Sequence, residues 1–446
     1  MKLLALTTVL LCSVSTLIPA QQLTTGKMLG QINAITESTS NIIPTHTRPI
    51  ALPPFALSTL PDVNSVSTEP LTALPKSLAI TNSAGQALWL DVEVEQGWRA
   101  VQGQWLLLAD DDSKKRLISH GAQILSESHY TGLGLALLRF QVPTALDSKS
   151  ALSKLLSTQA MQSLARNHIY QAQSQANAPQ DSPHFNAPLS TTSQAHICQS
   201  PVTVGIVDSA VDTEHAALSH ADITKKSFLP NTLTASLHHG TVIASLLVGN
   251  SQHLTPLLPA AKVYAAQVFY QQSDYAQGAT LSAIISGLNW LLEQNIKVIN
   301  MSLTGPENDI LQRVLNAAIA KGAWVIAAAG NEGPAAPAMY PAAYQGVIAV
   351  SAIDQQQKPY RWSNRGDYID YAALGVNVAT AQSGGELGRE SGTSIAAPVV
   401  TATIACLKAT HGDNKKALKA ALNQLAIDLG PQGKDPIYGI GAILRR

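Results

Sequence analysis

Five short apolar runs between residues 202 and 350 constrain the fold of this chain more than any other feature. None alternates apolar with polar residues, and helical patterns at about 281–294 and 307–321 lie among them. Such runs are typical of strands buried on both faces of a parallel sheet, and their alternation with helices predicts a doubly wound, mostly parallel α/β domain. The runs are Val202–Val207, Val263–Val268, Ile296–Met301, Trp324–Ala329 and Val347–Val350.

The N-terminal residues have the composition of an export signal followed by a linker. Within residues 1–20, Lys2 precedes the apolar run Leu3–Leu11, which predicts a cleaved signal peptide. A membrane anchor is the alternative, but serine and threonine residues interrupt the apolar stretch soon after it begins. Residues 21–80 are rich in proline, serine and threonine, and they predict a flexible linker.

Residues 81–170 predict a small α+β domain. Apolar alternation and helix-competent stretches give two helices among several strands, a pattern that suits a ferredoxin-like layer of sheet and helices. Residues 171–200 again read as a linker, open to proteolytic processing. The elements expected within 81–170 are strands near 88–94 and 105–109, a helix over 110–119, a hairpin of 123–129 with 133–142, a helix from about 148 to 166, and a strand over 167–170.

Charge and cysteine content exclude some functions and leave one question open. Lys plus Arg and Asp plus Glu both number 29, so the chain lacks the basic surface of a nucleic-acid binder. Cys198 and Cys406 remain after signal removal. Export permits a disulfide between them, and the apolar surroundings of Cys406 equally suit a buried thiol. The apolar run 395–407 is shorter than the ~20 residues that span a bilayer, so no membrane span is expected in the mature chain.

Three polar residues stand at element ends where acyl-transfer chemistry could use them. Asp208 directly follows the first strand, His239 opens a helix in which Gly240 permits close backbone approach, and Ser394 begins a long apolar helix. Serine acyl transfer needs a nucleophile, a base and an acid that orients the base. The N-terminus of a helix also favours the negative charge that develops beside the nucleophile. Each residue alone would equally suit a cap or turn, and their joint occurrence favours catalysis.

A fourth segment supplies a hydrogen-bond donor. Ala329–Gly330–Asn331 ends a strand with a side-chain amide beside a glycine. An asparagine amide can stabilise an oxyanion, although a turn asparagine would have the same local sequence.

On these segments the chain resembles the subtilisin-like serine proteases, or subtilases, over roughly residues 200–446. Residues 206–212 look like the aspartate motif of the family, with Ser209–Ala210 where Thr–Gly is commoner. Residues 239–244 are similar to the histidine motif, and 392–398 are similar to the serine motif. The Ala–Gly–Asn segment matches the oxyanion segment of the family.

The resemblance implies a serine endopeptidase with a defined set of site residues. Ser394 would attack the scissile carbonyl, His239 would act as the base, and Asp208 would orient it. Asn331 and the backbone N–H of Ser394 would bind the oxyanion. The implied substrate-cleft residues, which would pair with a peptide main chain, are Ser302, Leu303, Thr304, Gly305, Ala328, Ala329 and Gly330.

The resemblance also implies a domain layout and a set of partners. Residues 201–446 would be the catalytic domain, and 81–170 would be a propeptide that blocks the site until a cut between about Tyr170 and Pro201. The chain would then be an exported zymogen, secreted or periplasmic, that acts on polypeptides. An unrelated adaptor domain is the alternative for 81–170.

Other functions and cofactors have less support in the sequence. No ligand cluster has convincing metal spacing, so no cofactor is expected. Calcium is common in the family, but no carboxylates can be nominated for it here. A non-catalytic binding protein on the same scaffold is the main functional alternative. An esterase or lipase would need a Gly-x-Ser-x-Gly elbow, which the serine segment lacks.

Overall fold

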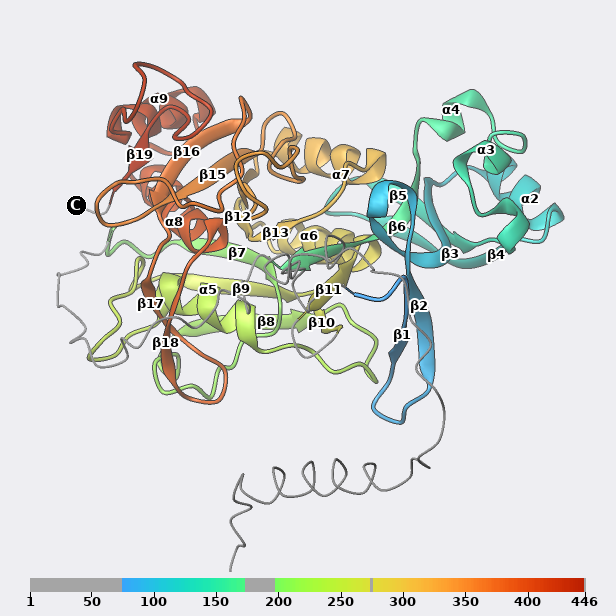
Figure 1. Cartoon of the computed structure of the whole chain (residues 1–446), viewed down its shortest axis with the longest axis horizontal. Helices are drawn as coiled ribbons and strands as arrows, with labels where there is room; N and C mark the ends of the chain where they lie inside the picture. The colour runs from blue at the N-terminus through green and yellow to red at the C-terminus, as the bar shows by residue number, and fades with distance from the viewer. Residues whose placement is uncertain (1–73, 173–196, 273–275, 445–446) are drawn as a thin grey trace, which may run out of the picture. The chain divides into compact units, whose positions relative to one another are not determined.

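The computed structural model of the chain describes residues 74–172, 197–272 and 276–444 (Figure 1). The chain divides into two units, Met1–Thr68 and Glu69–Arg446, and everything below concerns the second. The predicted export signal and most of both predicted linkers lie outside the described residues.

A parallel sheet of eight strands organises the C-terminal part of the chain (Figure 1). Its order is β19-β16-β15-β14-β12-β7-β9-β8, and every neighbouring pair is parallel. The five predicted strands are confirmed within it, whereas β8, β16 and β19 were not predicted. The strands are β7 (Thr203–Asp208), β8 (Asp222–Ser227), β9 (Lys262–Gln267), β12 (Val298–Met301), β14 (Trp324–Ala328), β15 (Ile348–Ile353), β16 (Ile369–Leu374) and β19 (Ala442–Ile443).

Helices cover both faces of this sheet. The helices α5 (His238–Val248) and α8 (Thr393–His411) share one hydrophobic core with Ile206, whereas Val207 belongs to the core formed with α6 (Leu281–Glu293) and α7 (Asp309–Ala320). Successive residues of one strand therefore point into different cores, which explains why the strand sequences are apolar without alternation. The helix α9 (Lys415–Leu425) packs on α8, and a separate two-stranded ribbon is formed by β17 (Val378–Ala381) and β18 (Leu387–Glu390).

The strand order reverses beside β7. From β7 the chain passes to β8 at the edge of the sheet and returns to β9 beside β7, and it then crosses to β12 on the other side of β7. In open α/β sheets, the carboxyl ends of the strands at such a reversal hold the functional groups. Asp208 is the last residue of β7, so it lies at this position.

A second sheet extends across the N-terminal and C-terminal parts of the described chain (Figure 1). Its main path is β1-β2-β3-β6-β11-β10. The strand β5 pairs with β3 and β4, and β13 pairs with β6. The members are β1 (Ser77–Thr81), β2 (Ala87–Glu93), β3 (Arg99–Leu108), β4 (Gln123–Tyr130), β5 (Leu135–Gln141), β6 (Leu164–Ala172), β10 (Tyr270–Gln271), β11 (Gln277–Thr280) and β13 (Leu303–Thr304).

The N-terminal part of this sheet has helices on one face, as expected of an α+β fold. Trp105, Leu107 and Phe140 pack there with residues of α2 (Asp111–Ser119), α3 (Lys149–Leu152) and α4 (Thr158–Met161). On the opposite face, Leu106 and Leu137 join the core that contains α6 and α7. This part of the chain is therefore packed directly against the parallel-sheet domain.

The predicted long helix from about 148 to 166 is wrong. The structure has the two short helices α3 and α4 instead, and β6 already begins at Leu164. Ser148 and Ser157 each accept a backbone N–H of the following turn, from Ala151 and Ala160, so each serine caps a new helix. The strand predicted at 167–170 is confirmed, and it is longer than expected.

The edges of the predicted linkers also differ from the structure. Strand β1 begins at Ser77, inside the segment predicted as a linker to residue 80, and β6 continues to Ala172, past the predicted boundary at 170.

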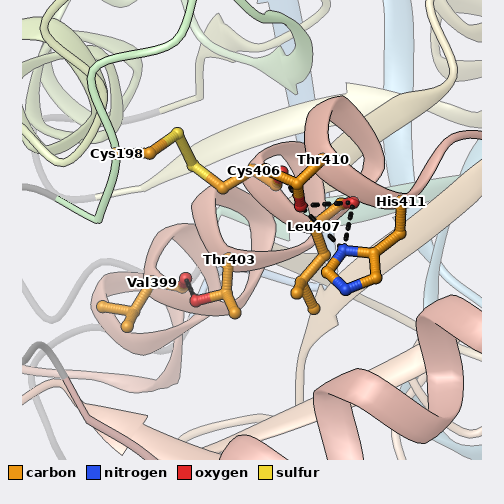
Figure 2. The surroundings of a disulfide bond; sticks show 7 residues. All are labelled: Cys198, Val399, Thr403, Cys406, Leu407, Thr410 and His411. Carbon is orange, nitrogen blue, oxygen red and sulfur yellow. Dashed lines mark hydrogen bonds between the residues drawn. A yellow bond between two sulfur atoms is a disulfide. The ribbon is translucent and has the colours of Figure 1, made fainter.

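Cys198 and Cys406 form a disulfide (Figure 2). The sequence was compatible with either a disulfide or a buried Cys406 thiol, and the structure has the disulfide. It joins residues 208 positions apart. Cys406 lies in α8, which is the one helix of the described ranges long and apolar enough to cross a membrane. Most of this helix is buried inside the protein, as for the core helix of a soluble domain.

Candidate active site

Asp208 and His239 meet at the carboxyl end of β7. The Nδ1 atom of His239 lies 2.7 Å from Oδ1 of Asp208, and both side chains are almost completely buried. The same carboxylate oxygen accepts the backbone N–H of Ser209 at 2.7 Å. The carboxylate is thus held by its own strand end and oriented toward the imidazole.

A glycine allows the two segments to approach this closely. A Cβ atom on Gly240 would lie 2.2 Å from the carbonyl oxygen of Ser209, so no larger residue fits there. The N–H of Gly240 also donates to the hydroxyl of Ser209 at 2.7 Å. The start of α5 therefore rests against the residue that follows Asp208, as the sequence predicted for Gly240.

The environment of His239 raises the pKa of its imidazole. Burial alone would lower this pKa, but the charge of Asp208 and its hydrogen bond outweigh burial, and Glu390 adds to the effect. Nε2 of His239 is buried and has no hydrogen-bond partner among the described residues. The neighbouring His238 instead lies beside Glu390, with 3.4 Å between Nε2 and Oε1.

Ser394 lies in the first turn of α8, and α8 packs against α5. Its side chain is buried, and its backbone carbonyl accepts a hydrogen bond from the hydroxyl of Ser302 at 3.1 Å. The serine and the histidine are therefore carried by two helices on the same face of the parallel sheet.

The amide of Asn331 is oriented by the residue before Ser394. Its Oδ1 atom accepts the backbone N–H of Thr393 at 2.9 Å and the hydroxyl of Thr393 at 3.1 Å. The same hydroxyl accepts the N–H of Gly330 at 3.1 Å. Because Oδ1 is occupied in this way, the NH₂ group of Asn331 points away from Thr393 and is the part of the amide able to donate to a ligand. Sequence reasoning missed Thr393, whose position next to the serine was the only available signal.

The residues expected to line a substrate cleft fall into two groups. Leu303 and Thr304 form β13 and pair with Ala172 and Gln171 of β6. The others bond elsewhere in the protein: Ser302 to Ser394, Gly305 to Tyr340, Ala328 to β15, the carbonyl of Ala329 to the Tyr368 hydroxyl, and Gly330 to Thr393 and Asn364.

The end of β6 is held between two strands of the parallel-sheet domain. On one side it pairs with β13, and on the other it pairs with β11 through Gly278, Ala279 and Thr280. Both pairings are antiparallel. The sequence analysis did not identify β11, because four residues that include a glycine carry no strand pattern.

Tyr170 of β6 fills a position that a glycine opens. Its ring is completely buried, and a Cβ on Gly305 would lie 2.3 Å from Cδ1 of the ring. Its hydroxyl donates to the carbonyl of Pro306 at 3.1 Å. A cavity of about 580 Å³ is lined by Gln171, Ala172, Thr304, Gly305, Asn331 and Glu332, among others. The candidate oxyanion donor thus borders the space that the end of β6 enters.

No group of three or more His, Cys, Asp or Glu side chains within 74–172, 197–272 and 276–444 could hold a metal ion.

Comparison with known proteins gives a family for this arrangement. A family model described as the subtilase family matches residues 199–441. Thermitase of Thermoactinomyces vulgaris is 33% identical over 236 residues, which are 52% of this chain and 82% of thermitase. Subtilisin E of Bacillus subtilis is 34% identical over 224 residues, which are 48% of this chain and 56% of subtilisin E.

Two further similarities cover comparable parts of this chain. The minor extracellular protease Epr of Bacillus subtilis is 28% identical over 246 residues, and the match spans 54% of this chain and 37% of Epr. The solved prenylagaramide maturation protease PagA is 26% identical with a TM-score of 0.47, and the match covers 54% of this chain and 90% of PagA. The family model accounts for more than half of the chain and contains Asp208, His239, Asn331 and Ser394. This chain belongs to the subtilase family.

Proposed function

We propose that residues 201–446 form a serine endopeptidase. The observation that carries the proposal is the buried hydrogen bond of 2.7 Å between Asp208 and Nδ1 of His239, which leaves Nε2 without a partner among the described residues. An imidazole held in this way is a general base with its acceptor nitrogen available. Ser394, on the helix packed against that of His239, is the nucleophile.

The reaction proceeds by acyl transfer. The Ser394 hydroxyl attacks the peptide carbonyl while Nε2 of His239 takes its proton, and the protonated imidazole then gives this proton to the leaving amine. Asp208 stays ionised and stabilises the imidazolium. Water then attacks the acyl-enzyme while His239 takes its proton, and the imidazole returns this proton to the oxygen of Ser394 as the acid product leaves. The NH₂ group of Asn331 and the backbone N–H of Ser394 stabilise the oxyanion in both steps.

Residues 81–170, with the adjoining strand ends, act as the inhibitory propeptide of this enzyme. The support is the pairing of β6 with β13 and β11, since an extended polypeptide substrate would need the same strand edges. With β6 in place, a second peptide cannot pair there. The natural substrates are polypeptides that add a strand at this position, and a bulky apolar side chain would enter the place of Tyr170.

The chain is exported as a zymogen to an oxidising compartment, either the periplasm or the exterior. Residues 1–20 have the composition of a cleaved signal, and the Cys198–Cys406 disulfide is typical of proteins outside the cytosol. One relative is itself described as extracellular.

A fluorophosphonate probe tests the proposed nucleophile. The processed wild-type protein should be labelled covalently, and Ser394→Ala should lose the label while retaining its thermal unfolding transition. A folded, processed wild type that resists labelling would rule out the enzyme and leave the alternative of a non-catalytic binding protein on the subtilase scaffold.

The same variant tests self-processing. We expect the cut between about Tyr170 and Pro201, in a segment that lies mostly outside the described residues. In a host that lacks other proteases, Ser394→Ala should accumulate uncut while Thr403→Ala, a change elsewhere on the same helix, is processed normally. Equal processing of Ser394→Ala and wild type in that host would show that the proposal of self-processing is wrong.

A further inference from the structure

Pro398 removes a hydrogen bond from the residue proposed as the nucleophile. In an α-helix, the carbonyl of residue 394 accepts the N–H of residue 398. Residue 398 lies inside α8 and is a proline, which has no N–H to give. The carbonyl of Ser394 is buried, and a buried carbonyl left without a donor is costly.

A side chain from the substrate-binding region supplies the missing donor. The hydroxyl of Ser302 lies 3.1 Å from the Ser394 carbonyl oxygen. A carbonyl can only accept, so the Ser302 proton must point toward Ser394. Ser302 directly precedes β13, the strand that pairs with β6, so the nucleophile is bonded to the residue next to the peptide-binding strand.

Two further side chains fix the direction of this bond. Nδ2 of Asn300 donates to the Ser302 hydroxyl oxygen at 2.8 Å. Oδ1 of Asn300 lies 3.0 Å from the hydroxyl of Thr401, which also lies 3.0 Å from the carbonyl oxygen of Ala397. Because the Ser394 carbonyl fixes the Ser302 proton, Asn300 must present its NH₂ group to Ser302 and its oxygen to Thr401. All three of these side chains are completely buried, and no bulk water competes for the bonds.

We infer that Ser302, held by Asn300 and Thr401, is a positioning residue that fixes the Ser394 peptide unit in place of the helix bond lost to Pro398. Holding this carbonyl fixes the backbone from which the Ser394 hydroxyl projects. It also ties that backbone to β13, so nucleophile and bound peptide keep one relative position. Misplacement of reacting atoms is felt in the chemical step more than in binding.

A double-mutant cycle tests the inference, which rests on the proposed role of Ser394. In processed protein, Ser302→Ala should lower kcat on labelled casein about tenfold with little change in KM, since the backbone of Leu303 and Thr304 still binds the peptide. Pro398→Ala restores an N–H four residues after Ser394. The double variant Ser302→Ala/Pro398→Ala should therefore recover to within about threefold of Pro398→Ala alone.

The control is Thr403→Val, which also removes a buried hydroxyl bonded to a carbonyl of α8. The Thr403 hydroxyl donates to the carbonyl of Val399 at 2.8 Å (Figure 2), and Val399 keeps its ordinary helix donor. Thr403→Val should leave kcat unchanged. The inference is wrong if the losses of kcat in the two single variants multiply in the double variant. It is also wrong if Ser302→Ala acts by raising KM rather than by lowering kcat.

A second variant covers the case in which Ser302→Ala does not fold. Thr401→Val removes the far end of the same chain of hydrogen bonds and should lower kcat about threefold, whereas an unchanged kcat would count against the inference. Failure of the proposed function can be told apart from failure of the positioning role. If wild type does not react with the fluorophosphonate probe, the proposed enzymatic function is wrong. A reactive wild type, with Ser302→Ala and Thr401→Val both fully active, removes only the positioning role.

Discussion

His239 experiences two opposing influences, burial and the charge of Asp208. Burial is the largest single influence and lowers the pKa of the imidazole, but the charge of Asp208, its hydrogen bond and the charge of Glu390 together outweigh burial, so this pKa lies above its usual value. The base form of His239 therefore predominates only at a pH above that raised pKa, and the acid side of the pH–rate profile reports where this happens.

Asp208→Asn should move that profile toward lower pH. Without the negative charge, the pKa of His239 falls, so the imidazole stays unprotonated in more acidic solution. The rate on the plateau should fall by a factor on the order of 10³–10⁴, because the imidazole loses its orientation and the stabilisation of its charged form. The measurement is kcat/KM against pH for processed wild type and variant.

Asp212→Asn is the matched control, since this carboxylate caps a nearby turn through the N–H of Glu214. It should leave both the profile and the plateau unchanged. A shift of the Asp208→Asn profile toward higher pH would contradict the assignment of Asp208 as the partner of His239.

Thr393 is expected to act on the oxyanion through Asn331. Thr393→Val removes a hydroxyl that binds both the Asn331 oxygen and the Gly330 N–H, so the amide loses one of the two contacts that orient it. We expect kcat to fall about tenfold with KM nearly unchanged, against a fall on the order of 10²–10³ for Asn331→Ala.

Thr393→Ser keeps the hydroxyl and should recover most of the rate. If Thr393→Val lowers kcat by the same factor in the Asn331→Ala variant as in wild type, the two residues act independently. The positioning role of Thr393 is then wrong.

At this scale, sequence reasoning found groups that are chemically distinctive and missed the ones that support them. Asp208, His239, Ser394 and Asn331 stood out because their residue types and element ends suit one reaction. Thr393, Asn300 and Thr401 are common residue types, and their roles arise from contacts between segments far apart in the chain. The effect of Pro398 on the Ser394 carbonyl depends on Ser302, which only the fold brings to that carbonyl.

Among the elements, β6 carries a histidine that must stay neutral. Asn308 uses its side-chain oxygen to cap α7, so it presents its NH₂ group to Nδ1 of His168 at 2.9 Å, and this nitrogen must accept. Burial first, and then the nearby Arg166, lower the pKa of His168 to about 4. Protonation of His168 would therefore break a contact between β6 and the start of α7.

Folding stability of the unprocessed chain should fall in acid because of His168. The unfolded chain binds this proton with an ordinary pKa of 6.5 and the folded chain with a pKa of about 4, so between these values the unfolded state binds more protons. Stability is then lost progressively as the pH falls through this window, by up to roughly 3 kcal/mol. Urea unfolding of the chain carrying Ser394→Ala, at a series of pH values, measures the loss.

His168→Gln cannot take up the proton and should show a flatter dependence over that window. His129→Gln, which alters an exposed histidine of the same α+β part, should behave as the parent does. Identical curves for parent and His168→Gln would contradict a neutral His168 in the folded chain.

Element prediction succeeded where the local pattern determined the structure. The strand β7 and the helix α6 have long apolar patterns and occur within a residue or two of the expected bounds. The predicted helix from about 148 to 166 failed because Ser148 and Ser157 restart the chain as caps. The strands β11 and β13 are too short to carry a pattern of their own. Both are strands because they pair with others, β13 with β6, and β11 with β6 and β10.

In the whole molecule, the Cys198–Cys406 bridge closes most of the parallel-sheet domain into one covalent loop (Figure 2). Ile197, beside it, donates its N–H to the carbonyl of Leu257 at 2.9 Å, so this end of the domain is also held by backbone bonding. Cys198 lies near the end of the segment in which the cut is expected, so a cut before Cys198 leaves the bridge in the mature protein.

Replacing both cysteines by serine should lower the free energy of unfolding by about 2–5 kcal/mol, since the unfolded chain is no longer restrained by a loop of this length. Thermal unfolding in the Ser394→Ala background avoids self-digestion during the measurement. Wild-type cysteines in that background should lose the same stability on addition of a thiol reductant. An unchanged transition in both cases would mean that the loop is held entirely by packing.

The antiparallel pairing of β6 with both β11 and β13 bears on how a population of these molecules would switch on. Cleavage of the backbone after Ala172 breaks no hydrogen bond between β6 and its neighbours β11 and β13. A newly cleaved molecule would therefore keep β6 bound to those strands. The site would then become accessible only when β6 dissociates, which is rare, or when another molecule that is already active digests it. Activity in a concentrated sample should therefore rise slowly at first and then accelerate, with a delay that shortens as more enzyme is present.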